Sequence, residues 1–112
     1  MKLKIRRIIV FTSQMPAMEA FYREVLGLKV VGREVGWVEF DAGACALALH
    51  AGGGTPGKRP PKIAFHAADV AAARTALMQR GAKMGKVLAA DAFAMCNGAD
   101  PDGNPFQISS RP

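Results

Sequence analysis

The chain has 112 residues, of which 50% are hydrophobic and 21% are charged, the composition of a single globular domain. Its 15 Lys and Arg against 9 Asp and Glu give a net charge of +6, but the basic residues are spread along the chain rather than gathered in one helical stripe, which argues against nucleic-acid binding and favours anionic small molecules. No apolar run reaches the ~20 residues that cross a bilayer, and the basic start lacks the apolar stretch of a signal peptide, so we expect a cytoplasmic protein that contacts no membrane.

Hydrophobic periodicity in the first half predicts a strand, a helix and three further strands. The first strand is expected over about 3–11, followed by a turn in which Ser13 is the expected N-cap of the helix. Gly27 ends this helix, because glycine accepts the left-handed conformation that follows a helix C-terminus. The apolar face of the helix holds Met15, Met18, Phe21 or Tyr22, and Val25, and the strands are expected near 29–33, 37–41 and 45–50.

A segment rich in glycine and proline, about 52–61, is the expected linker between two modules of about 1–51 and 62–112. The second module is predicted to open with a strand over 62–67, and Asp69 is the expected N-cap of a helix that Gly81 ends. The apolar face of this helix holds Val70, Ala73, Ala76 and Leu77, strands are expected near 83–89, 92–97 and 105–109, and a turn is expected at 100–104.

The two modules repeat one plan. Residues 8–11 align with 63–66 at an offset of 55, and residues 47–49 align with 106–108 at an offset of 59. Each half therefore reads as βαβββ. One such unit buries only one face of its sheet, so we expect the two units to pair around a shared cleft.

Two motifs carry a family resemblance: Phe21-Tyr22-x-x-Val25-Leu26-Gly27 in the first half, and Asp100-Pro101-Asp102-Gly103-Asn104-Pro105 near the end. With them the chain resembles, over essentially its whole length, the vicinal oxygen chelate superfamily of glyoxalase I, bleomycin-resistance proteins, fosfomycin-resistance enzymes and extradiol dioxygenases. The resemblance implies an α+β fold of two tandem βαβββ modules that form a U-shaped cup with the helices outside, and a homodimer. It does not fix the activity, because the family contains isomerases, transferases, dioxygenases and non-catalytic drug binders.

The metal enzymes of this family carry ligands at four positions, two in each half. The resemblance places these positions at Arg7, Ala48, Lys62 and Gln107, and the internal repeat pairs Arg7 with Lys62 and Ala48 with Gln107. A divalent metal binds neutral imidazole, carboxylate or thiolate, whereas guanidinium and ammonium groups are positively charged donors. We therefore predict that the metal site is lost, that no cofactor is needed, and that Arg7 and Lys62 form a basic anchor for an anion.

Strand alternation predicts that both histidines project into the cleft. If Ala48 points inward, so does His50, and if Lys62 points inward, so does His66. Each histidine is then either a hydrogen-bonded group at the rim or a general acid–base group. A relocated metal site made of His50, His66 and Glu39 is a further alternative.

Trp37 is the only tryptophan, and its neighbours look core-facing, so its own side chain is expected on the cleft face together with Glu39. It either stacks on a planar ligand or lies buried at an interface. Arg7 is merely a surface residue if the strand register is shifted by one. Cys45 and Cys96 lie in apolar strands and are expected to be reduced thiols that act as small hydrophobic residues.

We expect a metal-free small-molecule-binding protein of the glyoxalase/bleomycin-resistance type that sequesters a drug or metabolite. The ligand is expected to be anionic or planar. Two alternatives remain open: a metal-dependent lyase, isomerase or dioxygenase of the glyoxalase type with unconventional ligands, and a non-catalytic ligand sensor. The candidate ligand-binding residues are Arg7, Trp37, His50, Lys62, His66 and Gln107.

Overall fold

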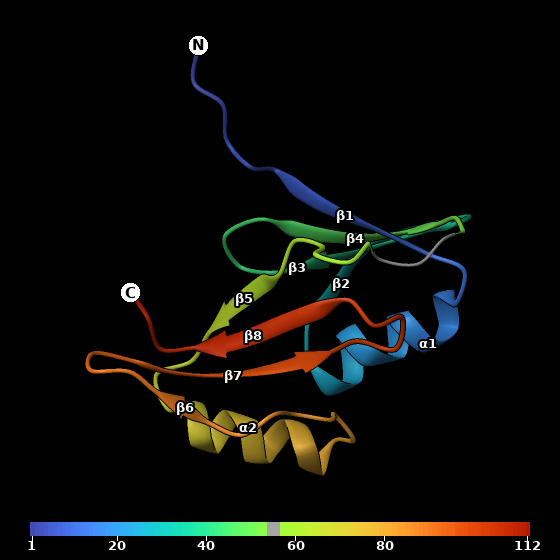
Figure 1. Ribbon diagram of the computed structural model, residues 1–112. Helices are drawn as coiled ribbons and strands as arrows, with labels where there is room; N and C mark the ends of the chain where they lie inside the picture. Colours follow the sequence, from blue (N-terminus) through green and yellow to red (C-terminus); the bar gives the residue numbers. More distant parts are fainter. Residues whose placement is uncertain (54–56) are drawn as a thin grey trace. The chain divides into compact units, whose positions relative to one another are not determined.

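The computed structural model describes residues 1–53 and 57–112. The chain divides into two compact units, Met1–Gly54 and Thr55–Pro112. Each unit is built on a four-stranded mixed sheet (Figure 1). In the described part of the chain, no helix combines the length and apolar character that crossing a membrane would require.

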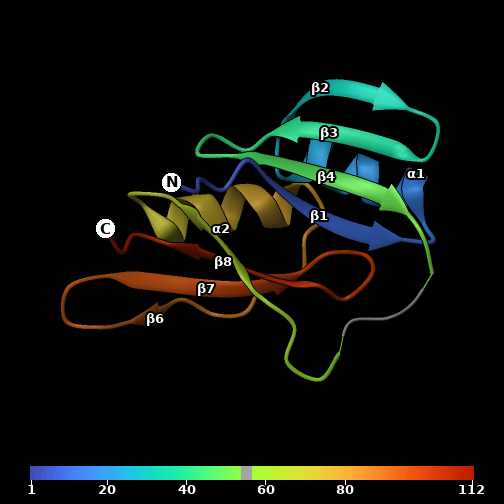
Figure 2. The same ribbon diagram turned by 90° about the horizontal axis from the view of Figure 1, so that it is seen from above.

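The first unit has the expected strand–helix–three-strand order. Its sheet has the strand order β1-β4-β3-β2, with β1 parallel to β4 and the other neighbours antiparallel. Helix α1 packs on one face of this sheet (Figure 2), and the core between them contains Met18, Phe21, Tyr22, Val38, Phe40, Leu47 and Leu49. The elements are β1 (Arg7–Thr12), α1 (Met15–Ala20), η1 (Phe21–Val25), β2 (Lys29–Glu34), β3 (Trp37–Asp41) and β4 (Ala46–Ala51).

The first strand begins four residues later than predicted, at Arg7 instead of Leu3. Its only neighbour, β4, begins at Ala46, which is the register partner of Arg7. Arg6 lies just before the strand, and its carbonyl accepts a hydrogen bond from the Ala46 amide at 3.0 Å. Residues 1–5 therefore continue beyond the first residue of β4, where the described part of the chain offers no strand to pair with them.

The prediction that Ser13 caps the first helix is wrong. The N-cap is Gln14, whose side chain makes no capping hydrogen bond. Instead, the buried Thr12 hydroxyl accepts a hydrogen bond from the Gln14 amide at 2.9 Å, and Pro16 occupies the first turn, where its missing N–H would have no partner anyway.

The last turn of this helix widens into the π-helical segment η1. The Leu26 amide donates to the Phe21 carbonyl five residues earlier, at 3.0 Å. This wider turn places two successive aromatic residues against the sheet: Phe21 is 7% exposed and Tyr22 is 2% exposed. Gly27 then ends the helix with φ +75°, as predicted.

The second unit repeats the strand order as β5-β8-β7-β6. Its helix begins as predicted, because the Asp69 carboxylate accepts a hydrogen bond from the Ala72 amide at 3.0 Å. The helix buries Val70 and Leu77, and Gly81 follows it with φ +98°. The elements are β5 (Ile63–His66), α2 (Val70–Gln79), β6 (Leu88–Ala89), β7 (Ala94–Ala99) and β8 (Pro105–Ser109).

The strand predicted over 83–89 is much shorter, because β6 spans only Leu88–Ala89. Before it, Met84 makes an isolated bridge to Gly98. The Gly85 carbonyl accepts a hydrogen bond from the Arg74 guanidinium at 2.7 Å. The Gly85 amide donates to the Asn97 carbonyl at 2.7 Å, and regular pairing with β7 resumes only at Leu88 and Ala89.

The predicted turn at 100–104 is confirmed. The buried Asp100 carboxylate accepts hydrogen bonds from the Asp102 and Asn104 amides, each at 2.9 Å, and from the Asn104 side chain at 2.8 Å. Gly103 adopts φ +88°, a conformation that a residue with a side chain rarely accepts.

The register of the two sheets confirms the internal repeat residue by residue. Ile8 pairs with Leu47 in the first sheet, and their repeat equivalents Ile63 and Phe106 pair in the second. Both pairs are parallel, so the two modules share strand order, direction and register. Equivalent positions can therefore be compared directly between the two sheets.

Candidate functional site

The first sheet has an open face opposite helix α1. Register pairs Trp37 with His50 and Glu39 with Ala48, and it places Arg7 beside Ala46 on the same face. Their strand neighbours Val38, Leu47 and Leu49 are buried on the helix side. The structure thus confirms that Arg7, Trp37, Glu39, Ala48 and His50 share one face and that the register is not shifted.

An ion pair crosses this open face. The Arg7 Nε donates to Glu39 Oε1 at 2.9 Å, and its Nη2 donates to Oε2 at 3.5 Å. Arg7 lies on β1 and Glu39 on β3, the two strands that flank β4. The pair spans β4 because the residues beneath it are Ala46 and Ala48, whose methyl groups leave the space free.

Aromatic rings cluster beside this ion pair. The Trp37 ring lies 5.7 Å from the His50 ring, and the Phe11 ring lies 5.1 Å from it on the other side. The Arg7 guanidinium carbon lies 5.7 Å from the centre of the Trp37 ring, within cation–π range. Phe11 remains 59% exposed, so the cluster presents flat apolar surface to solvent.

One side of the His50 ring is fixed. Its Nδ1 lies 2.9 Å from the Ala51 carbonyl oxygen, so this nitrogen carries the proton and donates, an assignment that follows from the hydrogen bond. The opposite nitrogen, Nε2, is then an acceptor in the neutral ring and belongs to an exposed residue. His50 is able to receive a hydrogen bond from a ligand hydroxyl or amide.

The second sheet carries an equivalent open face. Ala64 and Gln107 are register partners, as are His66 and Ser109, and Lys62 precedes β5 with the same alternation. The Lys62 ammonium donates to the Asn97 side-chain oxygen at 3.1 Å, and the Gln107 amide donates to the same oxygen at 3.1 Å. The predicted grouping of Lys62, His66 and Gln107 on one face is confirmed.

The two bridges occupy repeat-equivalent places. Asn97 pairs with Gln107 as Glu39 pairs with Ala48, so Lys62–Asn97 in the second sheet corresponds to Arg7–Glu39 in the first. Each begins at the start of the first strand of its module, at Arg7 in β1 and at Lys62 just before β5, and reaches the third strand across the fourth. Sequence reasoning missed Asn97, although carrying the repeat into the third strand of each module would have aligned it with Glu39.

The four positions that the family resemblance assigns to metal ligands do not fit a metal ion here. They hold a guanidinium paired with Glu39, a methyl group, an ammonium hydrogen-bonded to Asn97, and one amide. Two of these groups are cations that would repel a metal ion. Among residues 1–53 and 57–112, no three His, Cys, Asp or Glu side chains are grouped to hold a metal. The alternative site of His50, His66 and Glu39 joins residues of both units and stays a prediction.

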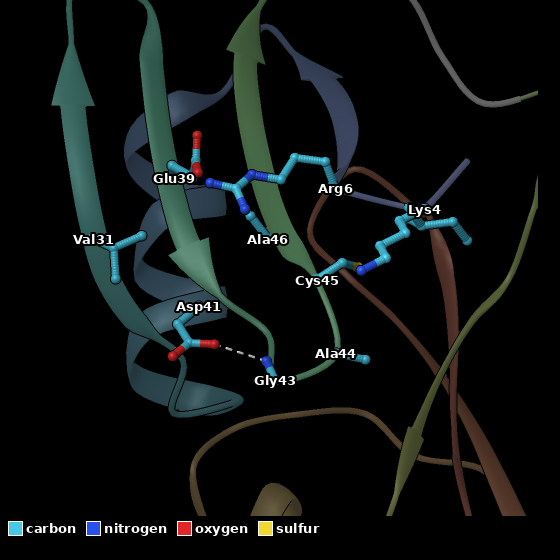
Figure 3. Close-up of a pocket in the computed structure, with 10 residues that line it drawn as sticks. Lys4, Arg6, Val31, Glu39, Asp41, Gly43, Ala44, Cys45 and Ala46 are labelled. Carbon is cyan, nitrogen blue, oxygen red and sulfur yellow. Dashed lines mark hydrogen bonds between the residues drawn. The ribbon is translucent and has the colours of Figure 1, made fainter. Parts of the chain in front are cut away.

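A pocket of about 460 Å³ opens at the other end of the first sheet, near the β3–β4 turn (Figure 3). It shares Glu39 with the open face and adds Lys4, Arg6, Asp41 and Cys45. Sequence reasoning did not select these four residues. The signal that points to the two cations is the alternation of basic and apolar residues over 1–6.

Comparison with protein families gives a match to one family model. The model of the Glyoxalase/Bleomycin resistance protein/Dioxygenase superfamily matches residues 4–108. No curated protein sequence matches this chain.

Solved structures similar to this chain share its fold. A glyoxalase/bleomycin resistance protein/dioxygenase from Nocardioides has a TM-score of 0.85 and 17% identity, and the match covers 97% of this chain and 83% of that chain. Lactoylglutathione lyase from Agrobacterium tumefaciens has a TM-score of 0.76 and 22% identity, with 94% and 91% covered. Similarity at this level of identity shows the fold and leaves the activity to be argued from the site.

Proposed function

Because the chain belongs to the Glyoxalase/Bleomycin resistance protein/Dioxygenase superfamily, we propose that it binds a small organic molecule in the cytoplasm without a bound metal ion and sequesters it. One observation carries the proposal. At the metal-ligand positions implied by the family, Arg7 and Lys62 are tied into side-chain bridges across the sheets, and exposed aromatic rings lie beside the first bridge.

The aromatic cluster favours a ligand with a planar portion. Trp37 is only partly buried and Phe11 is largely exposed, so a flat molecule placed on them covers apolar surface and contacts ring faces. His50 offers Nε2 as an acceptor at the same place. These three side chains form the planar-ligand surface of the first sheet.

The basic groups favour an anionic substituent. Glu39 engages Nε and Nη2 of Arg7, and within the described residues its Nη1 has no acceptor, so part of the guanidinium fork is open to a ligand oxygen. In the second sheet, Lys62 is bonded to an uncharged amide, so its charge is not neutralised by a described carboxylate. His66 and Gln107 complete that face as candidate contacts.

Tryptophan fluorescence tests this proposal directly, since Trp37 is the only tryptophan. We expect planar anionic compounds to change its emission more strongly than matched neutral or cationic compounds. Arg7→Gln should weaken the anionic binding, whereas Arg33→Gln, which also removes an ion pair but lies outside the aromatic cluster, should leave it unchanged. Compounds recovered unaltered after incubation support binding rather than turnover.

Metal analysis of the dialysed protein separates this function from the enzymatic alternative. We expect less than stoichiometric Zn, Ni, Mn and Fe. A metal retained at one equivalent per chain would contradict the proposal and favour a metal-dependent lyase, isomerase or dioxygenase with unconventional ligands.

A further inference from the structure

The pocket near the β3–β4 turn has one basic and one acidic wall. Lys4 and Arg6 line it from the segment before β1, and Glu39 and Asp41 line it from β3. In the close-up view, the Arg6 side chain extends across the sheet toward Glu39, and the Lys4 side chain extends in the direction of Cys45 (Figure 3). Its volume of about 460 Å³ falls in the range of small-molecule sites.

The charged side chains of the two walls differ in whether they already have partners within the protein. Glu39 is held by Arg7, and Asp41 accepts a hydrogen bond from the Gly43 amide at 2.8 Å. Within the part of the chain that the structure describes, the side chains of Lys4 and Arg6 form no ion pair with any carboxylate. Asp41 keeps its negative charge, because the Gly43 amide is a neutral donor, but with Glu39 paired to Arg7 the two cations outnumber it in the lining of this pocket. The remaining charge available to a ligand is therefore positive.

We propose that this pocket is an anion-binding site, in which Lys4 and Arg6 hold a carboxylate or phosphate group of a small organic molecule. Arg6 offers a planar fork of donors and Lys4 a mobile point charge, which together suit an oxyanion. The second oxygen of Asp41, on the facing wall, accepts a hydrogen bond from a hydroxyl group of the same molecule. The site is distinct from the planar-ligand surface and goes beyond the proposed function.

The sequence before β1 supports a role other than pairing. Residues 1–6 alternate apolar and basic side chains, a pattern typical of a strand with one buried face, yet among the described residues this segment pairs with no strand. Its basic side chains Lys4 and Arg6 both reach the pocket. The alternation thus brings two cations, two residues apart, to the same side of an extended segment.

Cys45 provides the readout, because it lines the pocket and is only partly buried, whereas Cys96 is fully buried. Alkylation of the folded protein by N-ethylmaleimide, followed by intact mass and peptide mapping, measures the rate at each thiol. We expect glycerol 3-phosphate and lactate to slow alkylation of Cys45, and glycerol and ethanolamine to have no effect. Inorganic phosphate distinguishes recognition of the anion alone from recognition of the hydroxyl-bearing molecule.

Substitutions of Lys4 and Arg6 test whether these two cations cause the protection of Cys45 from alkylation. Lys4→Gln and Arg6→Gln should each require about three- to tenfold more glycerol 3-phosphate for half-protection, the change expected for losing one exposed charge-assisted contact. Lys2→Gln lies in the same segment but does not line the pocket, so it should behave as the parent. Because these substitutions alter the charge near Cys45, protection is compared within each variant as the ratio of rates with and without probe.

Two results would overturn the anion site: equal alkylation rates with and without the anionic probes, or parental protection in the double variant Lys4→Gln/Arg6→Gln. Either result leaves the planar-ligand surface untouched, since that surface is read by Trp37 emission. Conversely, protection of Cys45 by anions with no Trp37 response to any planar compound supports this site and contradicts the proposed function.

Discussion

At the scale of single residues, burial separates the two thiols of this chain. Cys96 is 0% exposed within β7, and Cys45 is partly exposed before β4. Burial raises the pKa of the Cys96 thiol, and the positive charge of Arg74 opposes this effect less strongly. Cys96 therefore remains protonated in the fold and acts as a small apolar residue, as the sequence predicted.

The raised pKa of Cys96 predicts a loss of stability at high pH. Above about pH 8.5 the thiol of the unfolded chain ionises while the folded one keeps its proton, so the unfolded state is favoured as pH rises. We expect Cys96→Ala to cost about 1 kcal/mol near neutral pH, and this cost to shrink between pH 8 and 10. Urea unfolding at several pH values measures it, and a cost independent of pH would contradict the raised pKa.

At Gly98, any residue with a side chain would force the neighbouring side chains to move. A Cβ there would lie 2.7 Å from Met84 Sδ and 2.8 Å from Phe106 Cζ, and Phe106 is only 2% exposed. We expect Gly98→Ala to destabilise the protein by about 1–3 kcal/mol. Gly57→Ala meets no atom within 4 Å and should change the free energy of unfolding by less than about 0.5 kcal/mol, so thermal unfolding of both variants gives a matched comparison.

At the scale of elements, a charged contact ties helix α1 to the edge strand β2. Glu19 on the helix pairs with Arg33 on the strand, with one contact of 2.8 Å, and also with Arg23 one turn along at 2.9 Å. The hydrogen bond from Arg33 lowers the pKa of Glu19, partial burial opposes this, and the charges of Arg33 and Arg23 add to the lowering.

Replacing Glu19 should reduce stability in a pH-dependent way. A carboxyl group with a lowered pKa stabilises the fold above its unfolded value of about 4.3, and this stabilisation is lost as pH falls through the folded pKa. We expect Glu19→Gln to cost about 0.5–1 kcal/mol at pH 7, given that both arginines are substantially exposed, and nothing measurable at pH 2.5.

Glu24→Gln is the control for this helix–strand contact. Among the described residues, Glu24 forms an ion pair only with its neighbour Arg23, and it is 65% exposed. Its replacement should therefore change the free energy of unfolding by less than about 0.3 kcal/mol at either pH. Urea unfolding of the two variants at both pH values makes the comparison. A pH-independent loss in Glu19→Gln would assign its role to packing instead of charge.

At the scale of the whole molecule, the two units are built on the same plan with different side chains. The bridge across the first sheet is an ion pair and that across the second is a hydrogen bond between an ammonium and an amide. The orientation of the two open faces toward each other, and hence the cup, stays a prediction of the family resemblance.

We predict that the protein is a homodimer. Several large apolar side chains that belong neither to the planar-ligand surface nor to the pocket are exposed on one chain, among them Met78 at 44%, Val87 at 36% and Leu88 at 41%, and β1 and β2 lie at the edges of their sheet. Such edges and surfaces are usually covered by a partner. Light scattering at micromolar concentration should give twice the 11.9 kDa of one chain, and a monomer mass would contradict the prediction.

The sequence by itself determined the repeated βαβββ plan, the glycines that end both helices, the Asp100 turn and the face shared by Arg7, Trp37 and His50. These features depend on local conformational preference and on strand alternation, and both can be predicted from residues that are close together in the sequence. The tertiary structure alone decided where β1 begins, because Arg7 is the first residue that has a partner in the neighbouring strand β4. It also decided that Glu39 engages Arg7 and that Lys4 and Arg6 line a pocket, because these contacts join residues more than 30 positions apart whose distance follows only from strand order.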